Sequence, residues 1–220
     1  MRILGVPMGP RSKTMKSRPR LGILGGSFNP VHIGHLIAAQ DAMERFDLAR
    51  VLFIPSHVPP HKTGGALAPA ADRVAMLEAV LEDELRFEVS DLEVRRGGVS
   101  YSVETLRALA RERSGEDLYF IVGSDSLLDL HQWRESGAIL RLCTVITVAR
   151  PGTELARIRP EDLKLPRPWP SRLLSNAFTG RMIGISSSEI RHRAAEGLSL
   201  RYLVPREVET YIAEHRLYGA

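Results

Sequence analysis

The segment that most constrains the fold is Gly25-Gly26-Ser27-Phe28-Asn29-Pro30-Val31-His32-Ile33-Gly34-His35, which connects an apolar strand pattern to an apolar helix pattern. The strand covers Leu21 to Leu24. The helix begins near Gly34 and presents apolar residues at spacings of three and four, which are Leu36, Ala39, Met43 and Phe46. A strand that passes into a helix through a short glycine-containing turn is typical of an α/β sheet.

The turn in this segment has the properties of a phosphate-binding site. Gly25 and Gly26 lack a Cβ, so the backbone there can approach a phosphate closely. The first amide groups of the following helix have no partner within the helix and favour an anion. His32 and His35 are three positions apart, so both imidazoles lie on one side of the helix entrance and can contact one phosphate chain. We therefore expect a nucleoside triphosphate to bind here.

Other interpretations of the two histidines exist. A pair at this spacing can be half of a metal site, but zinc usually needs thiolate or carboxylate ligands as well, and Cys143 is the only cysteine. Each histidine alone could also be a capping or packed residue. The chain contains neither a Gly-x-x-x-x-Gly-Lys-Ser/Thr loop nor a Gly-x-Gly-x-x-Gly fingerprint. We expect no protein-bound metal, and the chain is neither a P-loop protein nor a dehydrogenase of the usual pattern.

Short β-rich runs alternate with helical patterns along the rest of the chain. Strands are expected at Val51 to Ile54, Leu118 to Val122 and Val145 to Val148, with a more exposed strand at Arg86 to Val94. Helices are expected at Asp72 to Glu82 and Val103 to Arg113, and Pro151 to Pro170 is expected to be irregular. This order predicts the α/β class, with a doubly wound parallel sheet in a single domain, and ligands at the carboxyl ends of the strands.

The charge of the chain is concentrated in its first residues. The 220 residues carry a formal charge of +4, with a sequence pI of about 9.5. Residues 1–20 hold six of the 30 basic residues and no acidic one, which leaves 24 basic against 26 acidic residues elsewhere. We therefore expect a basic, disordered tail at 1–20, a domain at 21–220 and no nucleic-acid partner. No apolar run is long enough for a membrane helix, so we expect a cytoplasmic protein that does not contact a membrane.

A second helix start lies near the C-terminus. Ser186, with Glu189 three positions later, fits a capping box, so a helix should start there and end near Gly197. The serines could serve only as caps. Arg191, one turn into the helix, favours a second phosphate-facing site because its guanidinium can bind phosphate oxygens bidentately.

Several motifs together resemble a known family. Besides the His-x-Gly-His element, the chain contains Ile54-Pro55, Pro59-Pro60-His61-Lys62, Gly98-Val99-Ser100-Tyr101-Ser102-Val103-Glu104-Thr105-Leu106, Gly123-Ser124-Asp125-Ser126-Leu127, Trp133 and Ile185-Ser186-Ser187-Ser188-Glu189-Ile190-Arg191. In this order they resemble the bacterial nicotinate-nucleotide adenylyltransferases, which belong to the nucleotidyltransferase superfamily with a Rossmann-like fold. The resemblance extends from Leu21 to Leu217-Tyr218.

The resemblance implies that the adenylyl group of ATP is transferred to nicotinate mononucleotide, giving nicotinate adenine dinucleotide and pyrophosphate. His32, His35 and Arg191 are expected to be catalytic, with His35 on the α-phosphate. The expected ATP-binding residues are Gly25, Gly26, Ser27, Phe28, His35, Gly123, Asp125, Ser187, Ser188 and Arg191. Mg²⁺ should enter with ATP, bridging phosphate oxygens, with few or no protein ligands.

The second substrate is expected to contact residues from three segments, which are His61 and Lys62, Ser102, and Asp125 with Trp133. Trp133, expected on a short helix, would face the pyridine ring, although Trp is also a common core residue. Ser102, expected to cap the helix that starts at Val103, would face the nicotinate carboxylate. Asp125 could accept from a ribose hydroxyl. Lys62 would steer the mononucleotide phosphate, although it could also be a solvated surface lysine.

Three positions depart from the family pattern. Asn29 stands where Asp is more frequent, Ser102 where Thr is usual and Glu104 where Asp is common. Alternative functions are a related adenylyltransferase that acts on nicotinamide mononucleotide or pantetheine phosphate, and a non-catalytic nucleotide-binding module. A homo-oligomer is possible from sequence, and nothing in the chain indicates its size.

Overall fold

The protein forms one parallel sheet with helices on both faces. The computed structural model describes residues 18–60 and 67–219. The strands run in the spatial order β3-β2-β1-β4-β5-β6 and every neighbouring pair is parallel. Their bounds are β1 Arg20–Gly26, β2 Arg50–Pro55, β3 Phe87–Val89, β4 Asp117–Gly123, β5 Thr144–Val148 and β6 Ala177–Phe178. The order reverses between β1 and β4, so the predicted doubly wound sheet is confirmed.

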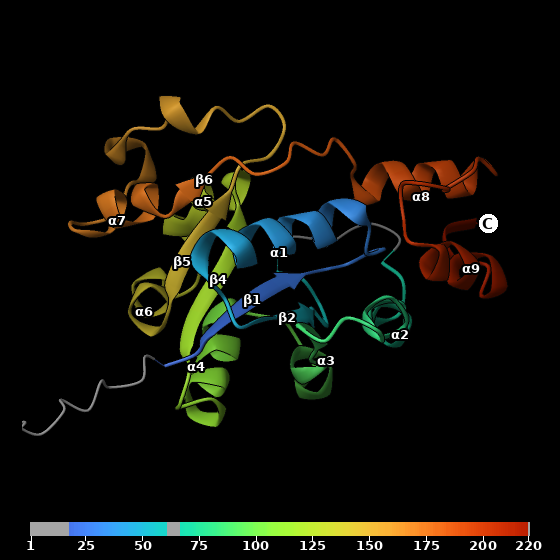
Figure 1. Cartoon of the computed structure of the whole chain (residues 1–220), viewed down its shortest axis with the longest axis horizontal. Coiled ribbons are helices and arrows are strands. Elements are labelled where there is room, and N and C mark those ends of the chain that lie inside the picture. Colours follow the sequence, from blue (N-terminus) through green and yellow to red (C-terminus); the bar gives the residue numbers. More distant parts are fainter. Residues whose placement is uncertain (1–17, 61–66, 220) are drawn as a thin grey trace, which may run out of the picture.

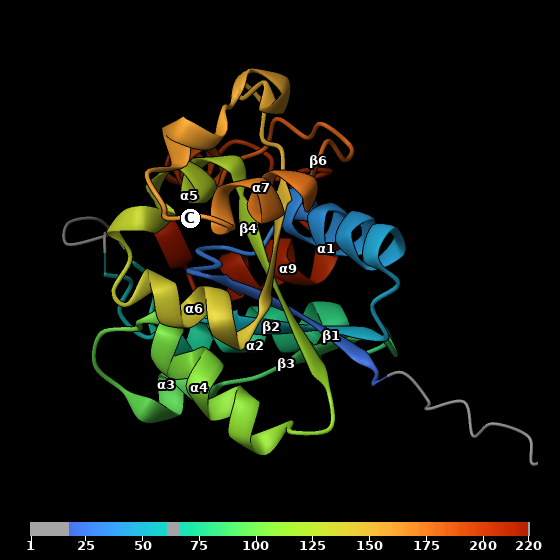
Figure 2. The same cartoon turned by 90° about the vertical axis from the view of Figure 1, so that its left-hand side faces the viewer.

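The helices cover the two faces of the sheet in separate groups (Figures 1 and 2). One group consists of α1 Ile33–Phe46, α2 Ala70–Leu81, α8 Ser187–Ala195 and α9 Arg206–Glu214. The other consists of α4 Ser102–Glu112, α5 Ser124–Asp129, α6 Ser136–Leu142 and α7 Trp169–Ser175. The remaining elements are α3 Leu92–Arg96 and the 3₁₀ helices η1 Leu130–Gln132, η2 Leu155–Arg157, η3 Pro160–Leu163 and η4 Leu217–Gly219.

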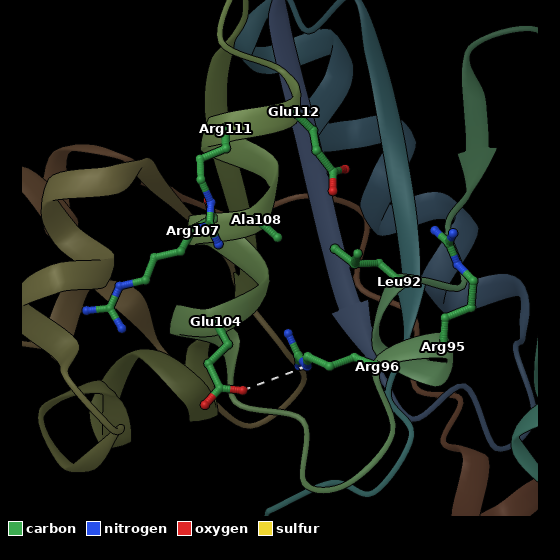
Figure 3. A pocket seen from close by; sticks show the side chains of 8 residues that line it. All are labelled: Leu92, Arg95, Arg96, Glu104, Arg107, Ala108, Arg111 and Glu112. Carbon is green, nitrogen blue, oxygen red and sulfur yellow. Dashed lines mark hydrogen bonds and ion pairs between the residues drawn. The ribbon is translucent and has the colours of Figure 1, made fainter.

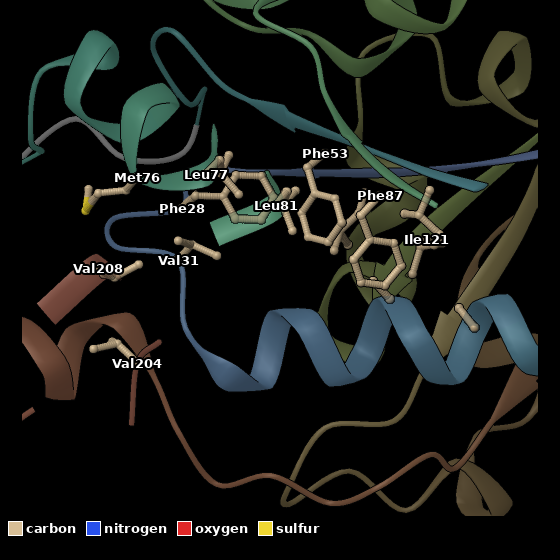
Figure 4. Close-up of a cluster of buried hydrophobic side chains, with 14 of the residues drawn as sticks. Phe28, Val31, Phe53, Met76, Leu77, Leu81, Phe87, Ile121, Val204 and Val208 are labelled. Atoms are coloured by element: carbon tan, nitrogen blue, oxygen red, sulfur yellow. The ribbon is translucent and has the colours of Figure 1, made fainter. Parts of the chain in front are cut away.

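Alternation along the strands explains this arrangement. In β2, Val51 and Phe53 face the cluster that contains α1 and α2, whereas Leu52 and Ile54 face the cluster that contains α4 and α6. Both faces of the central strands are therefore buried, which is why their sequence is an almost continuous apolar run. Figure 4 shows the first cluster, where Phe53 and Phe87 lie side by side between the sheet and α1, with ring centroids 5.3 Å apart.

The predicted elements are largely confirmed, with corrections at the edges of the sheet. The expected strand at Arg86 to Val94 is wrong in length, because only Phe87–Val89 pairs with β2 and Leu92–Arg96 is helical. The hydroxyl of Ser90 accepts from the backbone N–H of Leu92, and Arg95 donates its backbone N–H to Asp91, so helical bonds replace the strand there. Strand β6 has two residues and was not predicted.

Two other expectations concern the N-terminal tail and a membrane-spanning helix. Most of the tail expected at 1–20 lies outside them, and Arg20 already belongs to β1. Within the described part of the chain, no helix has the length and apolar character that a bilayer crossing requires.

Arg73 joins the loops that follow β1 and β2. Its side chain is fully buried on α2, and its guanidinium donates to four backbone carbonyl oxygens. These belong to Ser27 at 2.8 Å, Ser56 at 2.6 Å, His57 at 3.1 Å and Ala68 at 3.0 Å. Burial lowers the pKa of Arg73, and the carbonyl oxygens replace the hydration that the guanidinium loses. The carboxyl ends of two neighbouring strands are thus attached to one side chain.

Replacing Arg73 with Met should lower the free energy of unfolding by about 3 kcal/mol or more, because four backbone carbonyl groups, two of them in buried bonds, would each lose a donor. Urea denaturation followed by circular dichroism measures this change. Arg206→Met on the exposed start of α9 is the matched control and should change stability by less than about 0.5 kcal/mol. Equal losses in the two variants would contradict the role assigned to Arg73.

Candidate active site

The loop after β1 places its side chains in two directions. Gly25 and Gly26 are the last residues of β1, and Phe28 follows with a left-handed φ of 43°. The side chain of Phe28 is buried in the apolar cluster of Figure 4, with its ring at 5.0 Å from the His35 ring in an edge arrangement. The ring of Phe28, a residue predicted to bind ATP, is therefore buried against His35 and is not open to a ligand.

His32 and His35 lie together at the start of α1. His32 is the N-cap residue with extended backbone, His35 lies in the first turn, and their ring centroids are 3.8 Å apart. The backbone N–H of His32 donates to Nδ1 of His35 at 3.3 Å, which leaves the proton of a neutral His35 on Nε2. The predicted convergence of the two imidazoles is confirmed. A Cβ at Gly34 would lie 3.1 Å from Cε1 and Nδ1 of His32, so a glycine makes room for the ring.

His32 has an unusual environment for a titratable group. Its side chain is buried, and its Nδ1 makes no hydrogen bond with the described residues. Burial, with a smaller contribution from the charge of Arg150, lowers the pKa of His32 from 6.5 to about 4. His32 is therefore a neutral donor or acceptor near pH 7 and not a fixed positive charge.

The start of α8 meets the loop that leads into α1. Ser186 caps α8 by accepting from the backbone N–H of Glu189 at 3.1 Å, as predicted. Arg191 donates through Nη1 to the carbonyl oxygen of Asn29 at 2.8 Å and through Nη2 to the hydroxyl of Ser188 at 3.2 Å. Ser187 donates to the carbonyl oxygen of Pro30 at 3.0 Å. Two helix N-termini, both attractive to anions, thus lie next to each other.

The segment between β6 and α8 passes over α1 and is fixed there (Figure 1). The carboxylate of Asp41, buried on α1, accepts from the backbone N–H of Arg181 at 2.6 Å and from the Arg181 guanidinium. This double contact holds the segment against α1 shortly before α8 begins.

Arg150 was missed by the sequence analysis. It follows β5 at the carboxyl edge of the sheet, and its guanidinium pairs with the carboxylate of Asp125 at 3.3 Å. A Cβ at Gly123 would lie 2.4 Å from Asp125 Oδ1 and 2.5 Å from Arg150 Nε, so a side chain there would displace this ion pair from its present position. The position of Arg150 directly after a buried strand is the signal that could have identified it.

Two residues expected to contact the second substrate differ in local structure from the prediction. Trp133 is not on a helix, because it is the extended residue that follows η1, and its ring packs edge-on against Phe120 at 6.1 Å. Ser102 does not cap the helix, because Tyr101 is the N-cap residue and Ser102 is the first helical residue. The two segments are neighbours, since Arg134 lies over the Tyr101 ring at 4.5 Å. His61 and Lys62 lie outside the described residues.

Two surface grooves lie elsewhere on the molecule. One, of about 540 Å³, runs between α3 and α4 and is lined by Leu92, Arg95, Arg96, Glu104, Arg107, Ala108, Arg111 and Glu112 (Figure 3). The other, of about 630 Å³, includes Asp117 and Thr144, the first residues of β4 and β5, and so lies at the amino edge of the sheet. Those predicted substrate-binding residues that the structure describes line neither groove and lie towards the carboxyl edge.

Comparison with known proteins identifies the family of the chain. The model of the family described as cytidylyltransferase-like matches residues 23–193. A protein of Geotalea uraniireducens named "probable nicotinate-nucleotide adenylyltransferase" is 42% identical over 215 residues, covering 91% of this chain and 98% of the relative. One of the same name from Citrifermentans bemidjiense is 45% identical over 211 residues, covering 90% and 98%. The chain belongs to the nicotinate-nucleotide adenylyltransferase family.

Solved structures support the fold of this family member. The nicotinic acid mononucleotide adenylyltransferase of Plasmodium falciparum, solved in complexes with NaAD and with APC, matches with a TM-score of 0.69. The match covers 91% of this chain and 97% of the Plasmodium chain at 17% identity. At this identity the likeness concerns the fold, and it confirms the Rossmann-like architecture expected from the sequence.

The pKa of His32 has a consequence that NMR can measure. Because the folded pKa is about 4 and the ordinary value is 6.5, the unfolded chain binds the proton more readily between these pH values. His32 should therefore cost roughly 3 kcal/mol of stability as the pH falls through this window. In a titration of the imidazole resonances, Arg150→Ala should raise the pKa of His32 only partly, because burial is the larger cause. A wild-type His32 that titrates near 6.5 would contradict this assignment.

Proposed function

We propose that this protein transfers the adenylyl group of ATP to the 5′-phosphate of nicotinate mononucleotide, producing nicotinate adenine dinucleotide and pyrophosphate for NAD biosynthesis in the cytoplasm. The observation that carries the proposal is the bond from Arg191 to the carbonyl of Asn29, because it brings the N-terminus of α8 to the loop that enters α1. The substrates of the relatives, as their names give them, support the choice of nucleotide.

The reaction needs positioning more than it needs a base. An oxygen of the mononucleotide phosphate forms a bond to the α-phosphorus of ATP, and the bond from that phosphorus to the bridging oxygen of pyrophosphate breaks. The attacking phosphate is already ionised near pH 7, so no proton has to be removed from it. Catalysis then comes from alignment of the two substrates and from donors that meet the negative charge on the transferred and leaving groups.

The donors at the two helix starts suit these tasks. His35, with its proton on Nε2, is assigned to the α-phosphate, and His32 acts beside it as a neutral partner. The backbone at Gly25, Gly26 and Ser27 and the N-terminus of α1 would hold the triphosphate from one side. Ser187, Ser188 and Arg191 would hold it from the other. Arg150 adds a cation at the same edge, beside Gly123 and Asp125.

The same donors bear on how the expected Mg²⁺ would be held. The N–H and O–H groups at the two helix starts can donate to phosphate oxygens, and the positive charge of Arg191 disfavours a cation beside it. Within the described part of the chain, no three His, Cys, Asp or Glu side chains converge on a possible metal position. We therefore propose that Mg²⁺ enters with ATP and is held by phosphate oxygens, where it neutralises charge.

The nicotinate end is assigned to the segment after η1 and the start of α4. Trp133, half-buried against Phe120, would present its free face to the pyridine ring. The backbone and hydroxyl of Ser102, in the first turn of α4, would meet the nicotinate carboxylate. His61 and Lys62 keep their expected role near the mononucleotide phosphate.

Pyrophosphate release should be measured with ATP and Mg²⁺ and one of three acceptors: nicotinate mononucleotide, nicotinamide mononucleotide or pantetheine phosphate. A strong preference for the nicotinate form is expected. His35→Ala should lower the rate by about 10²- to 10³-fold because it removes a donor to the transferred group, while ATP still binds. His192→Ala, on the exposed side of α8, is the matched control and should leave the rate unchanged.

Three results would contradict parts of the proposal. An unchanged rate in His35→Ala would remove His35 from the mechanism. Comparable use of the nicotinamide form would remove the carboxylate contact at Ser102. Release with none of the acceptors, together with normal ATP binding, would indicate a nucleotide-binding module and not an enzyme.

The two tryptophans of the chain allow a test of the nicotinate subsite. Trp133→Ala should raise the KM for nicotinate mononucleotide by about 3- to 10-fold, because the aromatic contact is lost, and should leave the KM for ATP unchanged. Trp169→Ala, which changes the groove at the amino edge, is the control and should change neither KM. A larger effect on ATP than on the mononucleotide would place the pyridine ring elsewhere.

A further inference from the structure

The last described residues return to the loop that precedes α1. After α9 the chain turns at Arg216 and forms η4, which packs against α8 near the C-terminus seen in Figure 1. Tyr218 lies in η4 with a left-handed φ of 62° and a half-buried side chain. Its hydroxyl donates to Oδ1 of Asn29 at 2.8 Å. The contact joins residues that are 189 positions apart in the sequence.

Asn29 is the point where several segments meet. Its Oδ1 also accepts from the backbone N–H of Ala68 at 3.0 Å, and its own carbonyl oxygen accepts from Arg191 at 2.8 Å. Its side chain is only 4% exposed, so these bonds determine its position. The orientation of the Asn29 carbonyl, and with it the guanidinium of Arg191, depends on the donors that hold the Asn29 side chain.

The hydroxyl of Tyr218 is suited to remain a donor. Burial raises its pKa, with Asp72 acting in the same direction, whereas the nearby charges of Arg191 and Arg73 act in the opposite direction without reversing the shift. A neutral hydroxyl bonded to a neutral amide leaves the guanidinium of Arg191 without a competing carboxylate at this point. Arg191 therefore stays oriented by a carbonyl and a serine, both of which leave its charge uncompensated.

We propose that Tyr218 is a positioning residue for ATP, acting through Asn29 on Arg191. This inference rests on the proposed function, which places Arg191 on the triphosphate. Tyr218 itself touches no substrate. Its hydroxyl fixes the Asn29 side chain, the Asn29 carbonyl then fixes Nη1 of Arg191, and Ser188 fixes Nη2. Both bonds leave the other N–H groups of the guanidinium available to the triphosphate.

The first test is Tyr218→Phe, which removes the hydroxyl and keeps the ring. The dissociation constant for ATP with Mg²⁺, measured by calorimetry without a second substrate, should rise by about 3- to 10-fold, the effect of one lost hydrogen bond. The KM for ATP should rise equally, and the KM for nicotinate mononucleotide should stay unchanged. Tyr211→Phe is the matched control, because it removes a hydroxyl that donates to Asp72 at 3.0 Å, and it should leave ATP binding unchanged.

A double-mutant cycle separates positioning from general stability. Arg191→Ala should weaken ATP binding, and Tyr218→Phe in that background should cause no further loss, because both changes remove the same contact to the triphosphate. Additive effects would overturn the proposal, as would an equal rise of both KM values with a lower Tm. If Arg191→Ala leaves ATP binding unchanged, the triphosphate role of Arg191 itself fails. If only Tyr218→Phe is without effect, the positioning role alone fails.

Discussion

The fixed geometry of the active-site loops depends on the buried guanidinium of Arg73. A polar group inside a protein costs free energy unless it is hydrogen-bonded. Here the guanidinium donates to four carbonyl oxygens, which belong to the loops after β1 and β2 and to residue 68. The arginine thereby ties the loop before α1 to the end of β2.

The carboxyl edge offers many hydrogen-bond donors, which suits the phosphate oxygens that the proposed function places there. His32 is kept neutral by burial and by Arg150, so it adds a donor without adding a charge that would need solvent. Arg191 is oriented by a carbonyl and a hydroxyl, and both leave its charge available. Arg150 is paired with Asp125 in this state, with both side chains largely exposed to solvent. Binding a triphosphate would give the guanidinium a partner of higher charge.

The central sheet and the turn between β1 and α1 could be predicted from the sequence, because each depends on local spacing. The apolar runs of β1, β2, β4 and β5, the helical stripe of α1 and the cap at Ser186 are all readable within about ten residues. The errors concern contacts across the chain. Bonds to Ser90 and Asp91 start α3 where a strand was predicted. Trp133 follows η1 and is not on a helix. Arg150 pairs with Asp125, which follows the neighbouring strand β4. Tyr218 could not be linked to Asn29 by any pattern, since the two are far apart in sequence.

The bonds that join α8 and η4 to the Asn29–Pro30 loop span 157, 162 and 189 residues. The chain entropy that such long-range contacts cost has to be offset by the contacts themselves, so they depend on the C-terminal segment being in place. The sheet from β1 to β5 does not include that segment. Limited destabilisation of the C-terminal segment should therefore weaken ATP binding at the proposed site without melting the core.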